Sequence, residues 1–434
     1  MGFDVAVGAS QSQLNSVGAV LYKQLYPNLF TGSIQVEALN LTVAYDVQQP
    51  PTLNLNPPTA QERAALTQRA HEAAAAAGEL TAEAKAVLSA LMDSTVLLSI
   101  TAPQIAVTLT AADKSKTSLT VSASAVCQAD IDPTTGRIQL TTLHATVSQW
   151  TDPTVQWVLD NVISPQVLKI LDQYLSGITL PPLTIAGVTL SSPIVVVQDS
   201  MLIALTTLQR NGPPTPPPSG TSWPRANFFS LLDTAVVDAA AAYQVAQLNP
   251  QFDKSGSASW TVFRVHWGAN LTLGNPSIGI GNGFHLSLQL GGGVNAGLSA
   301  RLVVWNPSIN FGVGFSTNPN PGGTVGLRVD ASNRILLSIQ KVDSFGIAIQ
   351  IPGLPSWAND ALGWVTGVIT DGLTSALVPA VNAFIQGLRF SVFTIPTIPV
   401  DAGPVHVKVE PTGISVGNFA GMVAATGSLQ VSPA

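Results

Sequence analysis

Apolar residues recur along this chain at two different periods, and the two longest stretches of helical period lie far apart. Across residues 155–174, apolar side chains return at steps of three and four, which is typical of a helix with one buried face. Across residues 357–388 the same pattern continues for about 50 Å of helix at roughly 1.5 Å per residue. Each stretch contains one proline, Pro165 or Pro379, which we expect to bend its helix.

Elsewhere the apolar period falls to two, which predicts half-buried β-strands. Alternation of this kind is found in residues 34–45, with a phase slip near Ala38 that suggests a bulge, and again in residues 96–123, 286–304 and 325–351. Turn-forming residues separate the strands, as in Asp-Pro-Thr-Thr-Gly at 132–136 and Asp-Ala-Ser-Asn at 330–333. The pattern predicts an α+β protein made of antiparallel meanders.

A proline-rich segment, residues 209–225, divides the chain into parts of similar length, 1–208 and 226–434. Each part begins with a helix that ends at a proline, Pro27 or Pro250. Each part also closes with one of the long helices, whose internal proline is followed seventeen residues later by Pro182 or Pro396. We therefore predict two diverged copies of one unit, joined by an extended connector.

Residues 57–93 have no counterpart in the second part and predict an inserted helical hairpin. Thr59 with Glu62 forms a capping box, and Gly78 ends the first helix. The hairpin is interpreted either as a surface embellishment or as a docking face for a protein partner. The apolar residues that would make that face are Leu66, Val87, Leu88 and Leu91.

Composition excludes several classes of protein. Charged residues make up 10% of the chain, against roughly 25% in an average soluble domain, and the 18 Lys and Arg are scattered. A nucleic-acid partner is therefore not expected. The lone cysteine, Cys127, rules out an internal disulfide and predicts a small buried side chain.

The first residues contain neither a basic start nor an apolar run, so we expect a cytoplasmic protein or export by a non-classical route. The stretch 361–388 is apolar enough to suggest a transmembrane segment, but Asp371 at its centre argues against one. We expect a helix sheathed by its own sheet instead.

No pattern of catalytic residues is found. The five histidines are isolated from one another, and neither a His-Glu-x-x-His element nor a Gly-x-Ser-x-Gly elbow occurs. Asp130 and Asp132 could ligate calcium, although a plain hairpin turn is favoured because no acidic residue follows at the next loop positions. The glycine-rich runs at 279–283 and 291–293 lack the lysine of a phosphate loop. We expect a protein that is not an enzyme and that has no cofactor or metal.

The order of elements resembles the tubular lipid-binding (TULIP) superfamily: a helix, an antiparallel meander, a long closing helix and an extended strand, present twice. The opening Phe3-Asp4-Val5-Ala6-Val7 with Leu14-Asn15 resembles bacterial members from clostridial toxin gene clusters, and more distantly the BPI-like lipid-binding proteins. The resemblance implies two units arranged end to end. Each would be a long helix wrapped by a highly curved antiparallel sheet, with a hydrophobic groove between them.

Under this hypothesis the groove holds a lipid, a fatty-acyl chain or another hydrophobic ligand. The residues predicted to line it lie on the closing helices: Val158, Val162, Leu171, Leu175, Val368, Leu377, Phe384 and Leu388. A fully packed core would need the same residue types, so the sequence leaves both interpretations open. The rival hypothesis is an accessory protein, such as a toxin-complex component or chaperone, that docks a partner through the hairpin. Exposed Trp or Leu would also allow peripheral contact with a membrane.

Overall fold

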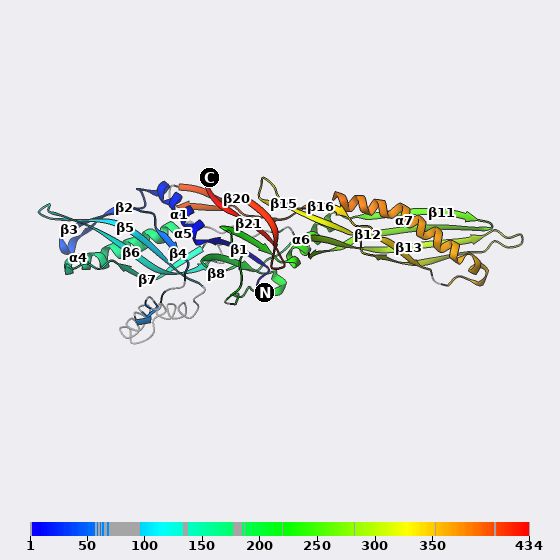
Figure 1. Ribbon diagram of the computed structural model, residues 1–434, viewed down its shortest axis with the longest axis horizontal. Helices are drawn as coiled ribbons and strands as arrows, with labels where there is room; N and C mark the ends of the chain where they lie inside the picture. Colours follow the sequence, from blue (N-terminus) through cyan, green and yellow to red (C-terminus); the bar gives the residue numbers. More distant parts are fainter. Residues whose placement is uncertain are drawn as a thin grey trace.

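The computed structural model describes residues 2–56, 59, 61, 63, 64, 67, 68, 96–132, 138–176, 185, 187–218, 220–281, 283–351, 353–402 and 405–433. These residues form three antiparallel sheets that follow one another along an elongated molecule, with helices packed against them (Figure 1). The predicted α+β class with curved antiparallel sheets is confirmed.

The first sheet occupies one end of the molecule and has the strand order β2-β3-β5-β6-β7, with β4 beside β5. Its strands are β2 (Thr31–Val36), β3 (Leu41–Val47), β4 (Thr52–Asn54), β5 (Leu97–Ala111), β6 (Lys116–Ile131) and β7 (Ile138–Val147). Burial alternates as predicted, for example at Val43, Tyr45 and Val47. The bulge predicted near Ala38 is wrong. A 3-10 turn, η1 (Glu37–Leu39), and the left-handed Asn40 reverse the chain there, so that β2 and β3 pair with each other.

The helix predicted at residues 155–174 packs on β6 and β7 and is built from three pieces. They are α4 (Pro153–Val158), the π-helical turn η3 (Leu159–Ile163) and α5 (Ser164–Ser176). Pro165 stands just after the π turn. Because proline has no N–H to donate to the preceding turn, a wider turn at this point costs the helix little.

The central sheet has the order β19-β20-β21-β10-β1-β9-β8. Its strands are β1 (Val5–Ser10), β8 (Ile194–Gln198), β9 (Met201–Thr206), β10 (Phe228–Leu232), β19 (Ile398–Ala402), β20 (Val405–Phe419) and β21 (Met422–Pro433). Strands from both sides of the segment 209–225 therefore share one sheet. The antiparallel pair β1 and β10 lies at its middle, with Val5 opposite Leu232.

A helix follows each of these two middle strands. Helix α1 (Gln11–Leu25) is capped by Ser10, which accepts from Gln13 N, and α6 (Thr234–Leu248) is capped by Asp233, which accepts from Ala235 N. Both helices end within two residues of the predicted prolines, Pro27 and Pro250.

The third sheet has the order β11-β12-β13-β15-β16-β18, and β13 also pairs with β14, which pairs with β17. Its strands are β11 (Gln251–Trp260), β12 (Phe263–Ile280), β13 (Phe284–Ala300), β14 (Ser308–Asn318), β15 (Gly322–Val329), β16 (Arg334–Val342), β17 (Gly346–Gln350) and β18 (Arg389–Thr394). The 3-10 helix η5 (Ser356–Ala361) leads into α7 (Leu362–Gly387), which packs between β11 on one side and β16 and β17 on the other.

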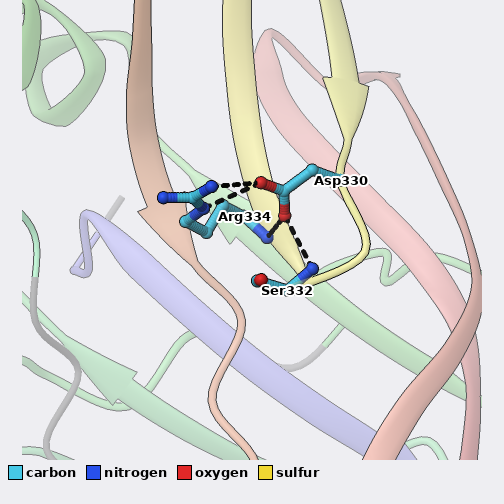
Figure 2. A network of polar contacts seen from close by, with 3 residues as sticks. All are labelled: Asp330, Ser332 and Arg334. Carbon is cyan, nitrogen blue, oxygen red and sulfur yellow. Dashed lines mark hydrogen bonds and ion pairs between the residues drawn. The ribbon is translucent and has the colours of Figure 1, made fainter.

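The turn predicted at residues 330–333 is confirmed and joins β15 to β16 (Figure 2). Asp330 Oδ1 accepts from the backbone N of Ser332 at 2.9 Å and of Arg334 at 3.0 Å, while its Oδ2 accepts from Arg334 Nε at 2.8 Å. These hydrogen bonds, above all those from Arg334, lower the pKa of Asp330 below its ordinary value.

The proline-rich segment 209–225 forms a short 3-10 turn, η4 (Gln209–Asn211), and then covers one face of the central sheet. Trp223 is 6% exposed and stacks on Phe3 and Phe229, with ring centroids 5.5 and 5.7 Å apart. On the other face of the sheet a continuous apolar core joins residues from all three sheets. The connector is thus a packed cover rather than a free spacer.

Candidate functional site

Helix α7 divides lengthwise into four rows of side chains, each with one residue every four positions. One row is fully buried against the third sheet, with every member at 0% exposure: Val365, Ile369, Leu373, Leu377, Val381 and Ile385. Residues four apart drift by about 40° per step around a helix of 3.6 residues per turn, so this row winds around the helix. A winding row can remain in contact with a twisted sheet along its whole length.

The row on one side of the buried row is apolar and partly exposed along its whole length. We call it the apolar flank, and its members are Trp364, Val368, Gly372, Ala376, Ala380 and Phe384. The row on the other side is mainly polar and includes Thr366, Thr370 and Asn382. The last row, which contains Asp371 and Pro379, is exposed. Asp371 therefore meets solvent and not the sheet.

The apolar flank faces β11, the edge strand of the third sheet, and we call the line between them the α7–β11 seam. An aromatic pair stands at each end: Trp260 with Trp364, ring centroids 5.8 Å apart, and Phe252 with Phe384, 6.1 Å apart. In the middle, the indole of Trp267 lies against Gly372 so closely that a Cβ there would be 2.6 Å from the ring. Between Trp267 and Phe384 the flank carries only Ala376 and Ala380.

The structure separates the predicted ligand-lining residues into two groups. Val368 and Phe384 are in the apolar flank, and Val162 is likewise partly buried. Val158, Leu171, Leu377 and Leu388 are 0 to 3% exposed and belong to the packed core. The side chain of Leu175 lies outside the described residues, as do Leu66, Val87, Leu88 and Leu91 of the predicted hairpin. The partner-docking face therefore stays a prediction.

One polar feature lies on the seam, and another lies across the buried row from it. Lys254 is exposed and, by strand alternation, lies on the same face of β11 as Phe252 and Gly256. The Oδ1 of Asn382, in the polar row of α7, is buried and accepts no hydrogen bond. A hollow of about 360 Å³ is lined by Lys254 together with Asp253 and Asn270, and a second of about 580 Å³ lies on the central sheet around Ser10 and Ser428.

Within the described part of the chain, no group of three or more His, Cys, Asp and Glu side chains is placed to hold a metal ion. His285 Nε2 contacts Asp343 Oδ2 at the surface, as an isolated pair. Among the same residues one helix, from Ser356 to Gly387, is long and apolar enough to cross a membrane by length and composition. Within the most apolar window of this helix, 28% of the residues are buried against the rest of the protein.

Sequence reasoning missed a cluster at the far end of the third sheet. Leu302 and Val304 are predicted in a strand, but β13 ends at Ala300 and residues 301–307 form a loop. Val303 and Val304 are 105% and 95% exposed. The available signal was Asn306-Pro307, because proline cannot donate to a sheet and often follows a turn.

No family model and no curated protein sequence matches this chain. Among solved structures, P47 of Clostridium botulinum E1 matches at 9% identity and TM-score 0.49 over 99% of both chains. P47 from Clostridium botulinum A2 matches at 8% identity and TM-score 0.49 over 98% of this chain and 97% of that one. A lipopolysaccharide binding protein matches at 11% identity and TM-score 0.37 over 99% of both chains.

Each of these matches extends over nearly the whole chain. Every TM-score is below 0.5 and every identity is near a tenth, so neither the family nor the ligand of this chain follows from them. Ligand and activity have to be argued from the residues of this chain.

Proposed function

We propose that the protein binds a lipid or another hydrophobic molecule along the α7–β11 seam and that it does so without catalysing a reaction. The observation that supports this is the apolar flank, which stays partly exposed from Trp364 to Phe384 beside a completely buried row. The twenty steps from Trp364 to Phe384 correspond to about 30 Å of helix. Single exposed apolar residues are ordinary, whereas a continuous strip of them marks a surface that something covers.

The side chains along the seam suit a thin, flexible ligand. The aromatic pairs Trp260–Trp364 and Phe252–Phe384 mark its two ends, and between Trp267 and Phe384 the flank carries only the small side chains of Ala376 and Ala380. An acyl chain lying over these alanines would gain about 0.8 kcal/mol for each CH₂ removed from water. A bulky, rigid molecule would not fit without moving Trp267.

Substituting the two alanines tests the site. In A376D/A380D two carboxylates occupy the place where the acyl chain of the ligand would lie. We therefore expect the affinity for a fluorescent fatty acid to weaken about tenfold or more. The matched control is S375D/A383D, which adds the same two charges to the exposed row of the same helix. The measurement is a fluorescence titration, with native mass spectrometry of the purified protein before and after denaturation.

Two results would contradict the proposal. One is a wild-type protein that carries no co-purified lipid and takes up neither fatty acid nor phospholipid. The other is equal weakening in A376D/A380D and S375D/A383D, since a general effect of charge would then explain the loss. Wild-type uptake that only A376D/A380D reduces would support the seam.

Lys254 provides a second test, directed at the polar end of the ligand. Its ammonium group is two residues from Phe252 on the seam face of β11, where a carboxylate or phosphate would find a positive charge. We expect Lys254→Gln to weaken binding of a fatty acid several-fold and to leave binding of its methyl ester unchanged. Lys341→Gln, an exposed lysine of β16, is the control. Equal effects on acid and ester would exclude the charge pairing.

A further inference from the structure

Large apolar side chains gather at the end of the third sheet farthest from the central sheet. They come from the β11–β12 turn, the β13–β14 loop and the start of the η5–α7 helix, and we call them the distal tip: Trp260, Val262, Leu302, Val303, Val304, Trp305, Trp357, Leu362 and Trp364. In Figure 1 the start of α7 lies at the right-hand end of the molecule, beyond the labels of β11 and β13. Four of the eight tryptophans of the chain belong to this tip.

Contacts between the three segments hold the tip together. Trp260 of the turn packs on Trp364 of α7, with ring centroids 5.8 Å apart, and Trp305 of the loop meets Trp357 of η5 at 6.1 Å. Arg301 N donates to Val262 O at 2.9 Å, which ties the loop to the turn. The side chains thus form one surface rather than three unrelated exposures.

The residues at the apex are the opposite of what a solvent-facing turn requires. Turns in water favour Gly, Asn, Asp and Pro, but the β11–β12 turn is Thr261-Val262, with Thr261 at φ 51°. Leu302 N donates to Trp305 O at 3.2 Å, which places Val303 and Val304 at the apex of the other loop. At 95 to 105% exposure these valines contribute nothing to the core of their own chain.

We propose that the distal tip inserts into the interface of a lipid bilayer that contains anionic headgroups. The apex consists of a two-residue turn and one short loop, which suits entry between headgroups better than a protein interface, where about 800 Å² per partner is usual. Tryptophans around an apolar apex match the preference of Trp for the membrane–water boundary. The tip is at the end of the long axis, so the body of the protein does not obstruct its approach.

Charges behind the apex point to anionic lipid. Arg264 follows Phe263 at the base of the turn, Arg301 precedes Leu302 at the base of the loop, and both are exposed. Guanidinium groups one residue behind inserted apolar side chains lie at the depth of lipid phosphates, which they bind in a bidentate manner. Asp360 of η5 is the exposed acid on the same segments. Its negative charge offsets one of the two arginines, so the tip keeps an excess of one positive charge.

Vesicle flotation tests the proposal with the full-length protein. Wild type should float with vesicles of phosphatidylcholine and phosphatidylglycerol, bind pure phosphatidylcholine less, and show quenching of its Trp fluorescence by brominated acyl chains. V303D/V304D should lower the bound fraction about tenfold, because charged side chains are costly in the bilayer. R264Q/R301Q should remove the preference for the anionic vesicles.

Controls distinguish insertion of the distal tip from non-specific adsorption and from ligand binding at the α7–β11 seam. L39D and W157A change exposed apolar residues of η1 and α4, and should leave flotation unchanged. V303D/V304D should melt at the wild-type temperature and still take up monomeric fatty acid, since its valines touch no core residue. The proposal is overturned by unchanged flotation of V303D/V304D, by absence of wild-type binding to either vesicle, or by a concentration-dependent dimer that V303D/V304D abolishes.

Discussion

At the scale of single residues, the contact between α7 and its sheet depends on one indole between two glycines. Trp267 of β12 is 5% exposed, and an added Cβ would be 2.6 Å from its ring at Gly372 of α7 and 2.8 Å at Gly256 of β11. Glycine is unfavourable inside a helix or strand. Its presence at both positions is explained by the indole that fills the space.

A pair of substitutions on α7 tests this contact. Gly372→Ala should destabilise the protein by about 1–3 kcal/mol, because the methyl group meets a buried ring. Gly367→Ala should instead stabilise it by up to about 1 kcal/mol, since nothing lies within 4 Å of its added Cβ and alanine favours the helix. The measurement is the free energy of unfolding in urea. Two stabilising substitutions would show that Trp267 is not tightly held.

At the scale of elements, the turns determine where strands reverse. In the β15–β16 turn the carboxylate of Asp330 binds both the backbone and the guanidinium of Arg334, four residues later, and the side chain of Arg334 stays at the surface (Figure 2). A carboxyl whose pKa is lower in the folded state stabilises the fold above its unfolded pKa, and this contribution is lost as the pH falls through the folded value.

We therefore expect Asp330→Ala to lower stability at pH 7. The difference from wild type should shrink as the pH falls from the ordinary value of 3.8 towards the lower pKa of folded Asp330, because the unfolded chain takes up the proton first. Asp330→Asn keeps one oxygen acceptor for the Ser332 and Arg334 amides and loses the charge. Its stability should therefore lie between those of the wild type and Asp330→Ala. Thermal unfolding at several pH values gives the comparison. A difference that stays constant down to pH 2 would rule out a role for the charge.

At the scale of the whole molecule, the central sheet joins the parts that the sequence separates. The β1–β10 pair, the hydrogen bond from Gln13 Nε2 to Leu429 O at 2.8 Å and the stacking of Trp223 on Phe3 all cross between residues 1–208 and the residues after them. The connector lies against this sheet and Pro214 and Pro217 are buried. The two parts therefore share a core.

Cleavage of the connector tests this sharing. A protease site inserted at Gly220, which is exposed and has no atom within 4 Å of an added Cβ, should allow one clean cut. The two pieces should then elute together from a gel-filtration column and separate only in denaturant. Pieces that separate in native buffer would show that the parts are independent.

Much of the fold could be predicted because it depends on local patterns. Alternation of apolar and polar residues predicted the strands of the first and third sheets. Pro27 and Pro250 predicted the ends of α1 and α6, and apolar residues at helical spacing predicted α7. Each of these signals is local, since the side-chain period reports which face an element buries. The errors, at Ala38 and residues 302–304, are positions where a turn has strand-like composition.

The candidate site depends on which residues lie close together in space, and the sequence alone does not give those distances. Apolar spacing determined that Val368, Leu377 and Phe384 belong to one helix, but Leu377 is buried and the other two are at a seam only because β11 and Trp267 lie where they do. Likewise, Trp260 meets Trp364 and Trp305 meets Trp357 although each pair is far apart in the chain, because the β11–β12 and β13–β14 hairpins reach the start of α7. Periodicity sets which residues face inward, whereas packing decides which of them remain accessible to a ligand or a membrane.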